Sequence, residues 1–202
     1  YSINNQFQVF AKSGLGFHSN DTRVVVAQEG KDILPTAFST DLGTIFKPFP
    51  KMIINTALWY LQLDQEFVYV GDAGIVEPSG KTRRMGVELG IRYQLTDWLY
   101  FDADANYTYG RSIDEPKGQD YIPLAPDFTT TGGLSFTKFK GFSGGFRYRY
   151  LKSRPANEDN SIVAKGYFVT DAAVNYTGRN WEIGISVQNL FNTRWKETQF
   201  DT

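Results

Sequence analysis

The chain has 202 residues, with 21 Lys and Arg against 22 Asp and Glu, so its net charge is −1. Because this near-neutral balance supplies no basic face for phosphate contacts, we expect no nucleic-acid partner. The chain contains no cysteine and a single histidine, His18, which argues against thiol catalysis, disulfides and His- or Cys-based metal sites. We therefore expect no catalytic residues, no metal, no cofactor and no enzymatic activity.

Apolar and polar residues alternate along most of the chain. Between positions 6 and 18 the odd positions are mainly apolar, and the even ones are polar or glycine apart from Phe10. A period of two is typical of a β-strand with one apolar face. The same pattern predicts nine strands and no helix, at residues 6–18, 37–47, 52–70, 82–95, 98–111, 128–138, 142–151, 167–176 and 181–190.

Short and long connections follow one another in strict order. Short connections are expected at 48–50, 96–97, 139–141 and 177–180, and long ones at 19–35, 71–81, 112–127 and 152–165. An antiparallel up-and-down sheet with tight turns at one rim and long loops at the other has this pattern, which is the signature of an outer-membrane barrel. Aromatic residues make up 16% of the chain and gather near the strand ends, as two interfacial girdles would require.

A soluble β-sandwich also alternates, and it is the alternative fold. Its strands are usually about 5–6 residues long, whereas those expected here reach ten or more. Its polar face would carry mostly Lys and Glu, whereas Gly, Asp, Asn, Thr and Arg dominate here. The sequence thus favours an all-β fold, an antiparallel up-and-down transmembrane β-barrel segment of about nine to ten long strands.

An odd number of strands leaves one edge without a partner, and bacterial barrels of this kind have even numbers. We therefore expect residues 1–202 to be part of a larger barrel. A small barrel complete in itself, with residues 22–28 or the C-terminal tail as a tenth strand, and a soluble β binding module are the alternatives.

Several segments resemble the late barrel region of TonB-dependent receptors. They are Leu34-Pro35, Asp41-Leu42-Gly43, Pro48, Ala57-Leu58-Trp59-Tyr60, the run from Glu66 to Asp72, Ser79-Gly80-Lys81-Thr82-Arg83-Arg84, Gly86-Val87-Glu88, Ile122-Pro123-Leu124-Ala125-Pro126 and Val187-Gln188-Asn189-Leu190-Phe191-Asn192. Each element alone is weak, but their order and spacing together are fairly specific and cover nearly the whole chain.

The resemblance implies an outer-membrane receptor and active transporter of a Gram-negative bacterium. Such a protein takes up a scarce solute such as an iron–siderophore complex, using energy from TonB. Its partners would be outer-membrane lipid, a plug domain of the same protein, TonB and a small-molecule ligand. The chain lacks the family's plug, TonB box and final strand, so the resemblance implies a portion of the barrel.

In a barrel the apolar positions face lipid and the polar positions face the lumen. The lumen- or plug-facing candidates are Arg84, Glu88, Arg92, Asp102, Asp104, Arg147, Arg149 and Asp171. Arginine suits such a surface because its fork binds a carboxylate through two parallel bonds. These charges would either grip the plug or form a ladder between barrel strands, and the sequence leaves both possibilities open.

Contact with a ligand is expected at the outer rim, where aromatic rings and arginines can bind an anion by stacking and charge. The candidates are Arg83, Tyr109, Arg111, Tyr121, Arg154 and Trp195. Packing within the girdle or the loops is the alternative role for these residues.

Overall fold

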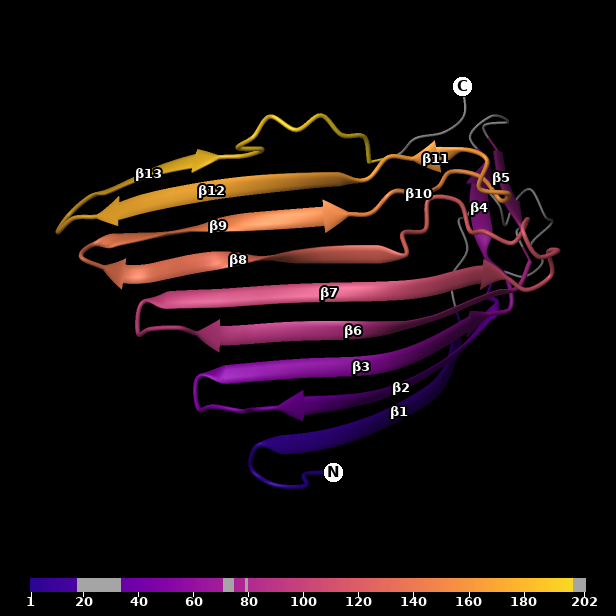
Figure 1. Cartoon of the computed structure of the whole chain (residues 1–202), viewed down its shortest axis with the longest axis horizontal. Helices are drawn as coiled ribbons and strands as arrows, with labels where there is room; N and C mark the ends of the chain where they lie inside the picture. Colours follow the sequence, from indigo (N-terminus) through magenta and orange to yellow (C-terminus); the bar gives the residue numbers. More distant parts are fainter. Residues whose placement is uncertain (18–33, 71–74, 79, 198–202) are drawn as a thin grey trace.

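The computed structural model describes residues 1–17, 34–70, 75–78 and 80–197 of the chain. Nine antiparallel strands form one sheet in the order β1-β2-β3-β6-β7-β8-β9-β12-β13 (Figure 1). Their bounds are β1 Phe7–Phe17, β2 Thr36–Phe46, β3 Met52–Leu63, β6 Thr82–Gln94, β7 Leu99–Ser112, β8 Phe128–Phe139, β9 Phe142–Leu151, β12 Tyr167–Thr177 and β13 Glu182–Val187. Neighbours in the sheet follow one another along the chain, which confirms the predicted up-and-down topology.

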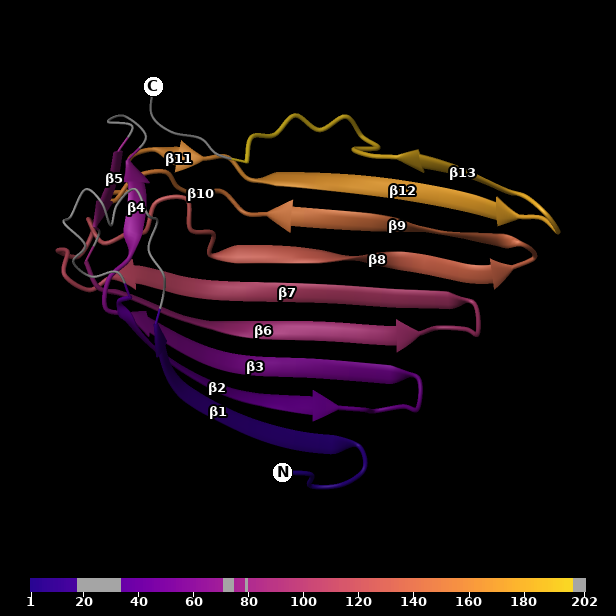
Figure 2. The same ribbon diagram turned by 180° about the vertical axis from the view of Figure 1, so that it is seen from behind.

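The two rims of the sheet differ as the connection lengths predict. Tight turns join the strands at one rim, and the long connections lie at the other, as Figures 1 and 2 show from both sides. Two long connections contain small ribbons of their own, β4 Phe67–Val70 with β5 Ile75–Pro78 and β10 Arg154–Pro155 with β11 Val163–Ala164. At the turn rim, the Lys51 ammonium lies 2.7 Å from Asp97 and ties two neighbouring turns. The hydrogen bond from Lys51 lowers the pKa of the Asp97 carboxyl.

Two predicted strands are longer than the strands observed. The prediction of one strand over 52–70 is wrong, because the main sheet loses this segment after Leu63 and Phe67–Val70 pairs with β5 instead. The prediction over 181–190 is also too long. The pairing of β13 stops at Val187, and Asn189 adopts a left-handed backbone with φ 51°. No helix in the described residues is long and apolar enough to cross a membrane.

The two faces of the sheet have opposite chemistry. Leu42, Leu58, Val87 and Tyr107 form one row across β2, β3, β6 and β7, and they are 58%, 57%, 45% and 51% exposed. In the described part of the chain, the buried apolar residues are Leu63, Ile122, Ala164 and Val169. Among the described residues no second layer covers the sheet, and so large an apolar face requires an apolar environment.

Aromatic rings pair near both rims of the sheet. At the turn rim the centroids of Trp98 and Phe139 are 4.4 Å apart, and those of Phe142 and Tyr176 are 4.8 Å apart. Toward the loop rim the pairs are Phe38 with Tyr60, Phe128 with Tyr150 and Tyr148 with Phe168. Two aromatic belts that border a band of aliphatic side chains match the girdles of a membrane barrel.

A charge on the apolar face tests this assignment of faces. We expect Leu58→Arg to lower the free energy of unfolding by about 2–4 kcal/mol, because Leu58 lies in the middle of the apolar band. Urea unfolding of the protein in detergent micelles, followed by heat-modifiable gel mobility, measures the loss. The control is Asn55→Arg on the same strand and the opposite face, which should cost less than about 1 kcal/mol. Equal losses would contradict the assignment.

Candidate functional site

All eight lumen- or plug-facing candidates lie on the polar face of the sheet. The register places Arg92, Asp102, Gly133, Arg147 and Asp171 in one row across β6, β7, β8, β9 and β12. The next row toward the loop rim contains Gly90, Asp104, Thr131 and Arg149. Glu88 and then Arg84 follow at higher levels of β6. Charges of both signs thus alternate across four or five neighbouring strands.

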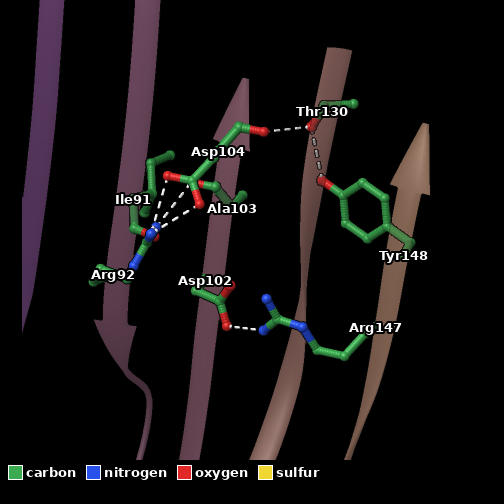
Figure 3. A network of polar contacts seen from close by, with 8 residues as sticks. All are labelled: Ile91, Arg92, Asp102, Ala103, Asp104, Thr130, Arg147 and Tyr148. Atoms are coloured by element: carbon green, nitrogen blue, oxygen red, sulfur yellow. Dashed lines mark hydrogen bonds and ion pairs between the residues drawn. The ribbon is translucent and has the colours of Figure 1, made fainter. Parts of the chain in front are cut away.

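The ion pairs of this face cross from strand to strand (Figure 3). Asp102 binds Arg147 across the intervening strand β8, and the directly opposed Asp171 is not the partner of Arg147. This is possible because Gly133 separates Asp102 from Arg147 in the row. A Cβ atom at Gly133 would lie 3.0 Å from Arg147 Cδ and 2.1 Å from the Phe146 carbonyl oxygen. The glycine therefore provides the space in which the arginine crosses β8.

A second pair joins β6 and β7. Arg92 Nη2 donates to both carboxylate oxygens of Asp104, at 3.0 and 2.8 Å. Its Nη1 also donates to two backbone carbonyls, those of Ile91 and Ala103, at 2.9 and 3.3 Å. The residue opposite Asp104 is Gly90, whose added Cβ would lie 3.1 Å from the carboxylate. Glycine again leaves the space that a charged side chain on the next strand uses.

Arg84 has a different role from its neighbours on the polar face. Its Nη2 lies 2.6 Å from Oε1 of Glu66, and Thr82 Oγ1 donates to Oε2 of the same carboxylate at 2.8 Å. Glu66 lies in the connection between β3 and β4, so this pair fastens the base of that loop to the wall. Sequence reasoning assigned no contact to Glu66, because it placed this residue inside one predicted strand over 52–70.

The middle of the polar face forms a hollow of about 370 Å³, lined by Phe10, Asn55, Glu88, Asp104 and Asn106 among others. Phe10, the apolar exception in the alternation of the first strand, lies over Gly43 of β2. In the next row Trp59 lies against Gly86. The Trp59 Nε1 and Asn106 Oδ1 atoms are buried without a hydrogen-bond partner. Glu88 is exposed and forms no ion pair with the described residues.

A second hollow, of about 450 Å³, lies near the last strands and contains Arg147, Arg149, Asp171 and Trp195. The segment after β13 folds back over this face. Asn189 N–H donates to Asp171 at 2.8 Å, and the Asn189 side chain bonds both the N–H and the carbonyl of Thr193. Trp195 then reaches the Tyr167 ring, at a centroid distance of 6.0 Å, and lies 5.9 Å from the Arg149 guanidinium.

Glu197 fixes the end of this tail. Its carboxylate accepts hydrogen bonds from Trp195 Nε1 and from the Tyr167 hydroxyl, both at 3.0 Å. These bonds, that from Trp195 above all, lower the pKa of the Glu197 carboxyl. Arg154 is only 4% exposed and donates to the Glu197 carbonyl oxygen. Two of the six rim candidates, Arg154 and Trp195, therefore meet at the end of the tail.

The other four rim candidates lie elsewhere. Arg83 and Arg111 face each other across β6 and β7 on the apolar face, and Tyr109 lies one step below them. Tyr121 belongs to the long connection after β7 and stacks on Arg111 at 4.1 Å. The structure thus divides the predicted rim set between the two faces of the sheet. Among the described residues, no three His, Cys, Asp or Glu side chains gather in a way that could hold a metal ion.

Comparisons with known proteins agree with this geometry. Residues 1–190 match the family model described as TonB dependent receptor-like, beta-barrel. The chain belongs to this family. A curated relative, the ferrioxamine receptor of Yersinia enterocolitica, is 24% identical over 180 residues, which are 83% of this chain and 25% of the receptor. The chain thus spans about a quarter of that relative.

Solved structures of the family superpose over the whole sheet. The ferric yersiniabactin uptake receptor of Yersinia pestis gives a TM-score of 0.78 at 14% identity, covering 100% of this chain and 32% of that protein. The ferric-catecholate import receptor of E. coli K12 gives 0.75 at 18% identity, covering 99% of this chain and 31% of that protein. At these identities the likeness shows the fold alone.

Filling the space at Gly133 tests how the polar face is built. We expect Gly133→Val to lower the free energy of unfolding by about 1–3 kcal/mol, because the new side chain meets the Phe146 carbonyl and blocks Arg147. Urea unfolding in micelles measures the change. Thr131→Val, two residues away on the same strand and face, is the control and should stay within about 0.5 kcal/mol. If both variants behave alike, Gly133 does not provide the crossing space.

The tail contact should depend on pH. The Glu197 carboxyl has a lowered pKa in the folded protein, so the stability that its hydrogen bonds contribute is fully present above its unfolded pKa and is lost as pH falls through the lowered value. As pH falls through that lowered value we expect Trp195 to leave Tyr167, with a red shift in its fluorescence. The difference spectrum between the parent and Trp195→Phe isolates this signal. Glu197→Gln should remove the acid transition, and an unchanged transition in that variant would refute the assignment.

Proposed function

We propose that the protein is an outer-membrane receptor and active transporter of a Gram-negative bacterium, and that residues 1–202 form part of its barrel wall. Its solute is a scarce one such as an iron–siderophore complex, and its energy comes through TonB. The family match over 190 residues and the apolar band between two aromatic belts support this location. The ferrioxamine receptor, as a curated relative, supports a ferric chelate as the solute class.

The observation that carries the proposal is an exposed, unpaired acid in the hollow of the polar face. Glu88 lines this hollow, is exposed and forms no ion pair with the described residues. A polar body that fills the lumen, namely the plug domain of the same protein, would supply a partner for this carboxylate. The ion pairs of Arg92 and Arg147, by contrast, hold the wall itself together.

We expect the plug to be captured from the position of Glu88. A photoreactive benzoylphenylalanine in place of Glu88 should form an internal cross-link to the plug, because Glu88 faces the hollow. The same residue in place of Leu89 is the matched control, since Leu89 points to the opposite face and should cross-link lipid. Each variant is irradiated in intact outer membranes and then digested, and mass spectrometry identifies the cross-linked partner. No internal cross-link from position 88, or equal ones from 88 and 89, would contradict the proposal.

Ligand contact is proposed at the corner formed by Arg149 and Trp195. The hollow there places the Arg149 guanidinium beside the Trp195 indole near the loop rim, next to Arg147, which is paired with Asp102. A cation beside an aromatic ring suits an anionic chelate, which binds by charge and stacking. Arg154 is buried beneath the tail, so its proposed part is to hold Glu197 and thereby Trp195 in place.

Uptake by living cells tests the function directly. We expect a deletion strain starved of iron to lose uptake of at least one radiolabelled ferric siderophore from a panel that includes ferrioxamine. The intact gene should restore uptake in the deletion strain. It should not restore uptake in a strain that also lacks TonB. Uptake of the whole panel at parental rates in the deletion strain would reject a ferric siderophore as the solute.

A further inference from the structure

Two arginines of the apolar face lie in an arrangement that the sheet itself does not explain. Arg83 of β6 and Arg111 of β7 are direct partners in the register. They continue a column whose lower members are Met85 with Tyr109 and then Val87 with Tyr107. The two guanidiniums therefore project from the face that carries the apolar band, at its border with the loop rim.

Like charges placed directly opposite each other on neighbouring strands destabilise a sheet. The structure only partly relieves this repulsion. Asp120 Oδ2 lies 3.6 Å from Arg111 Nε, and Arg83 is exposed and has no ion pair with the described residues. Another carboxylate of this junction, that of Asp114, accepts the backbone N–H of Lys81. Asp120 thus pairs with Arg111 alone, and the charge of Arg83 has no carboxylate partner among the described residues.

Arg111 is held in a fixed orientation. Its guanidinium carbon lies 4.4 Å from the centroid of the Tyr109 ring and 4.1 Å from that of Tyr121. Its Nη1 also donates to the Gly110 carbonyl at 2.6 Å. Arg111 is therefore a prearranged cation between two aromatic rings, and Arg83 beside it is free to close on an anion.

We propose that Arg83 and Arg111 form a binding site for a phosphate group of an outer-leaflet lipid headgroup. Arginine forks bind phosphate through paired, charge-assisted hydrogen bonds, and one phosphate between the two guanidiniums would turn their repulsion into attraction. The position selects a lipid as the source, because the site lies on the lipid-facing side at the level of the aromatic belt, where headgroups lie. The inference rests on the proposed outer-membrane location.

The test uses the natural protein, purified from outer membranes and transferred to phosphatidylcholine nanodiscs that contain diphosphorylated or dephosphorylated lipid A. Native mass spectrometry counts the lipid A that stays bound. We expect retention of the diphosphorylated form only. The double variant Arg83→Gln/Arg111→Gln should bind it roughly tenfold more weakly or worse. Arg179→Gln, which removes one arginine charge at the turn rim, is the control and should bind normally.

A charge reversal separates binding from folding. Arg83→Glu places opposite charges across the two strands, so in lipid-free detergent it should be at least as heat-stable as the parent. It should nevertheless lose the phosphorylated lipid. Retention of lipid A by Arg83→Glu, or equal retention of both lipid A forms by the parent, would overturn the proposal. The uptake assay for ferric siderophores is a separate experiment. If the protein transports another solute, the lipid-binding result still tests the proposed phosphate site.

Discussion

The alternation of side chains along unbroken antiparallel strands is the constraint on which the rest of this structure depends. Because the sheet is a single layer, every strand must serve two different environments, and a shift by one residue would exchange them. The register across β2, β3, β6 and β7 keeps Leu42, Leu58, Val87 and Tyr107 in one row. The same register places the charges of the opposite face at common levels, so the apolar band and the ion-pair network have one cause.

Glycine has a specific use on the polar face. Larger side chains repeatedly occupy the space above a glycine of the neighbouring strand, as Phe10 does over Gly43, Trp59 over Gly86, Asp104 over Gly90 and Arg147 over Gly133. A strand rich in glycine is usually a weak strand. Here each glycine leaves space for a side chain of a neighbouring strand to pack over it or to reach past it. The glycines therefore lower the local strand propensity and at the same time permit the contacts that hold neighbouring strands together.

The sequence predicted the strand positions and the faces well because both depend on local periodicity. It placed Arg92, Asp102, Asp104 and Arg147 on one face, but it could not say which acid pairs with which base. That choice requires the register of β7, β8 and β9 and the position of Gly133, which are properties of paired strands. The sequence also left a choice between a ladder and a plug contact. Within the described residues Arg92 pairs with Asp104, Arg147 pairs with Asp102, and Glu88 forms no ion pair.

One failure of sequence reasoning has a plain physical origin. The extension of the third strand to Val70 failed because Phe67–Val70 is as strand-like as the residues before it, and only its pairing with β5 distinguishes it. For the rim candidates the sequence predicts a position near one rim and does not say which face each residue occupies. Position along a strand predicts the rim, whereas the face follows from parity, which separates Arg83 from Arg84.

The difference between the two rims has a consequence for how such a wall can diversify. Tight turns join β2 to β3, β6 to β7, β8 to β9 and β12 to β13, and long backbone pairing keeps these hairpins in register with one another. The register therefore does not require short connections at the other rim. Insertions or replacements there can change the surface at that rim without disturbing the rows below, so one wall can carry many different rims.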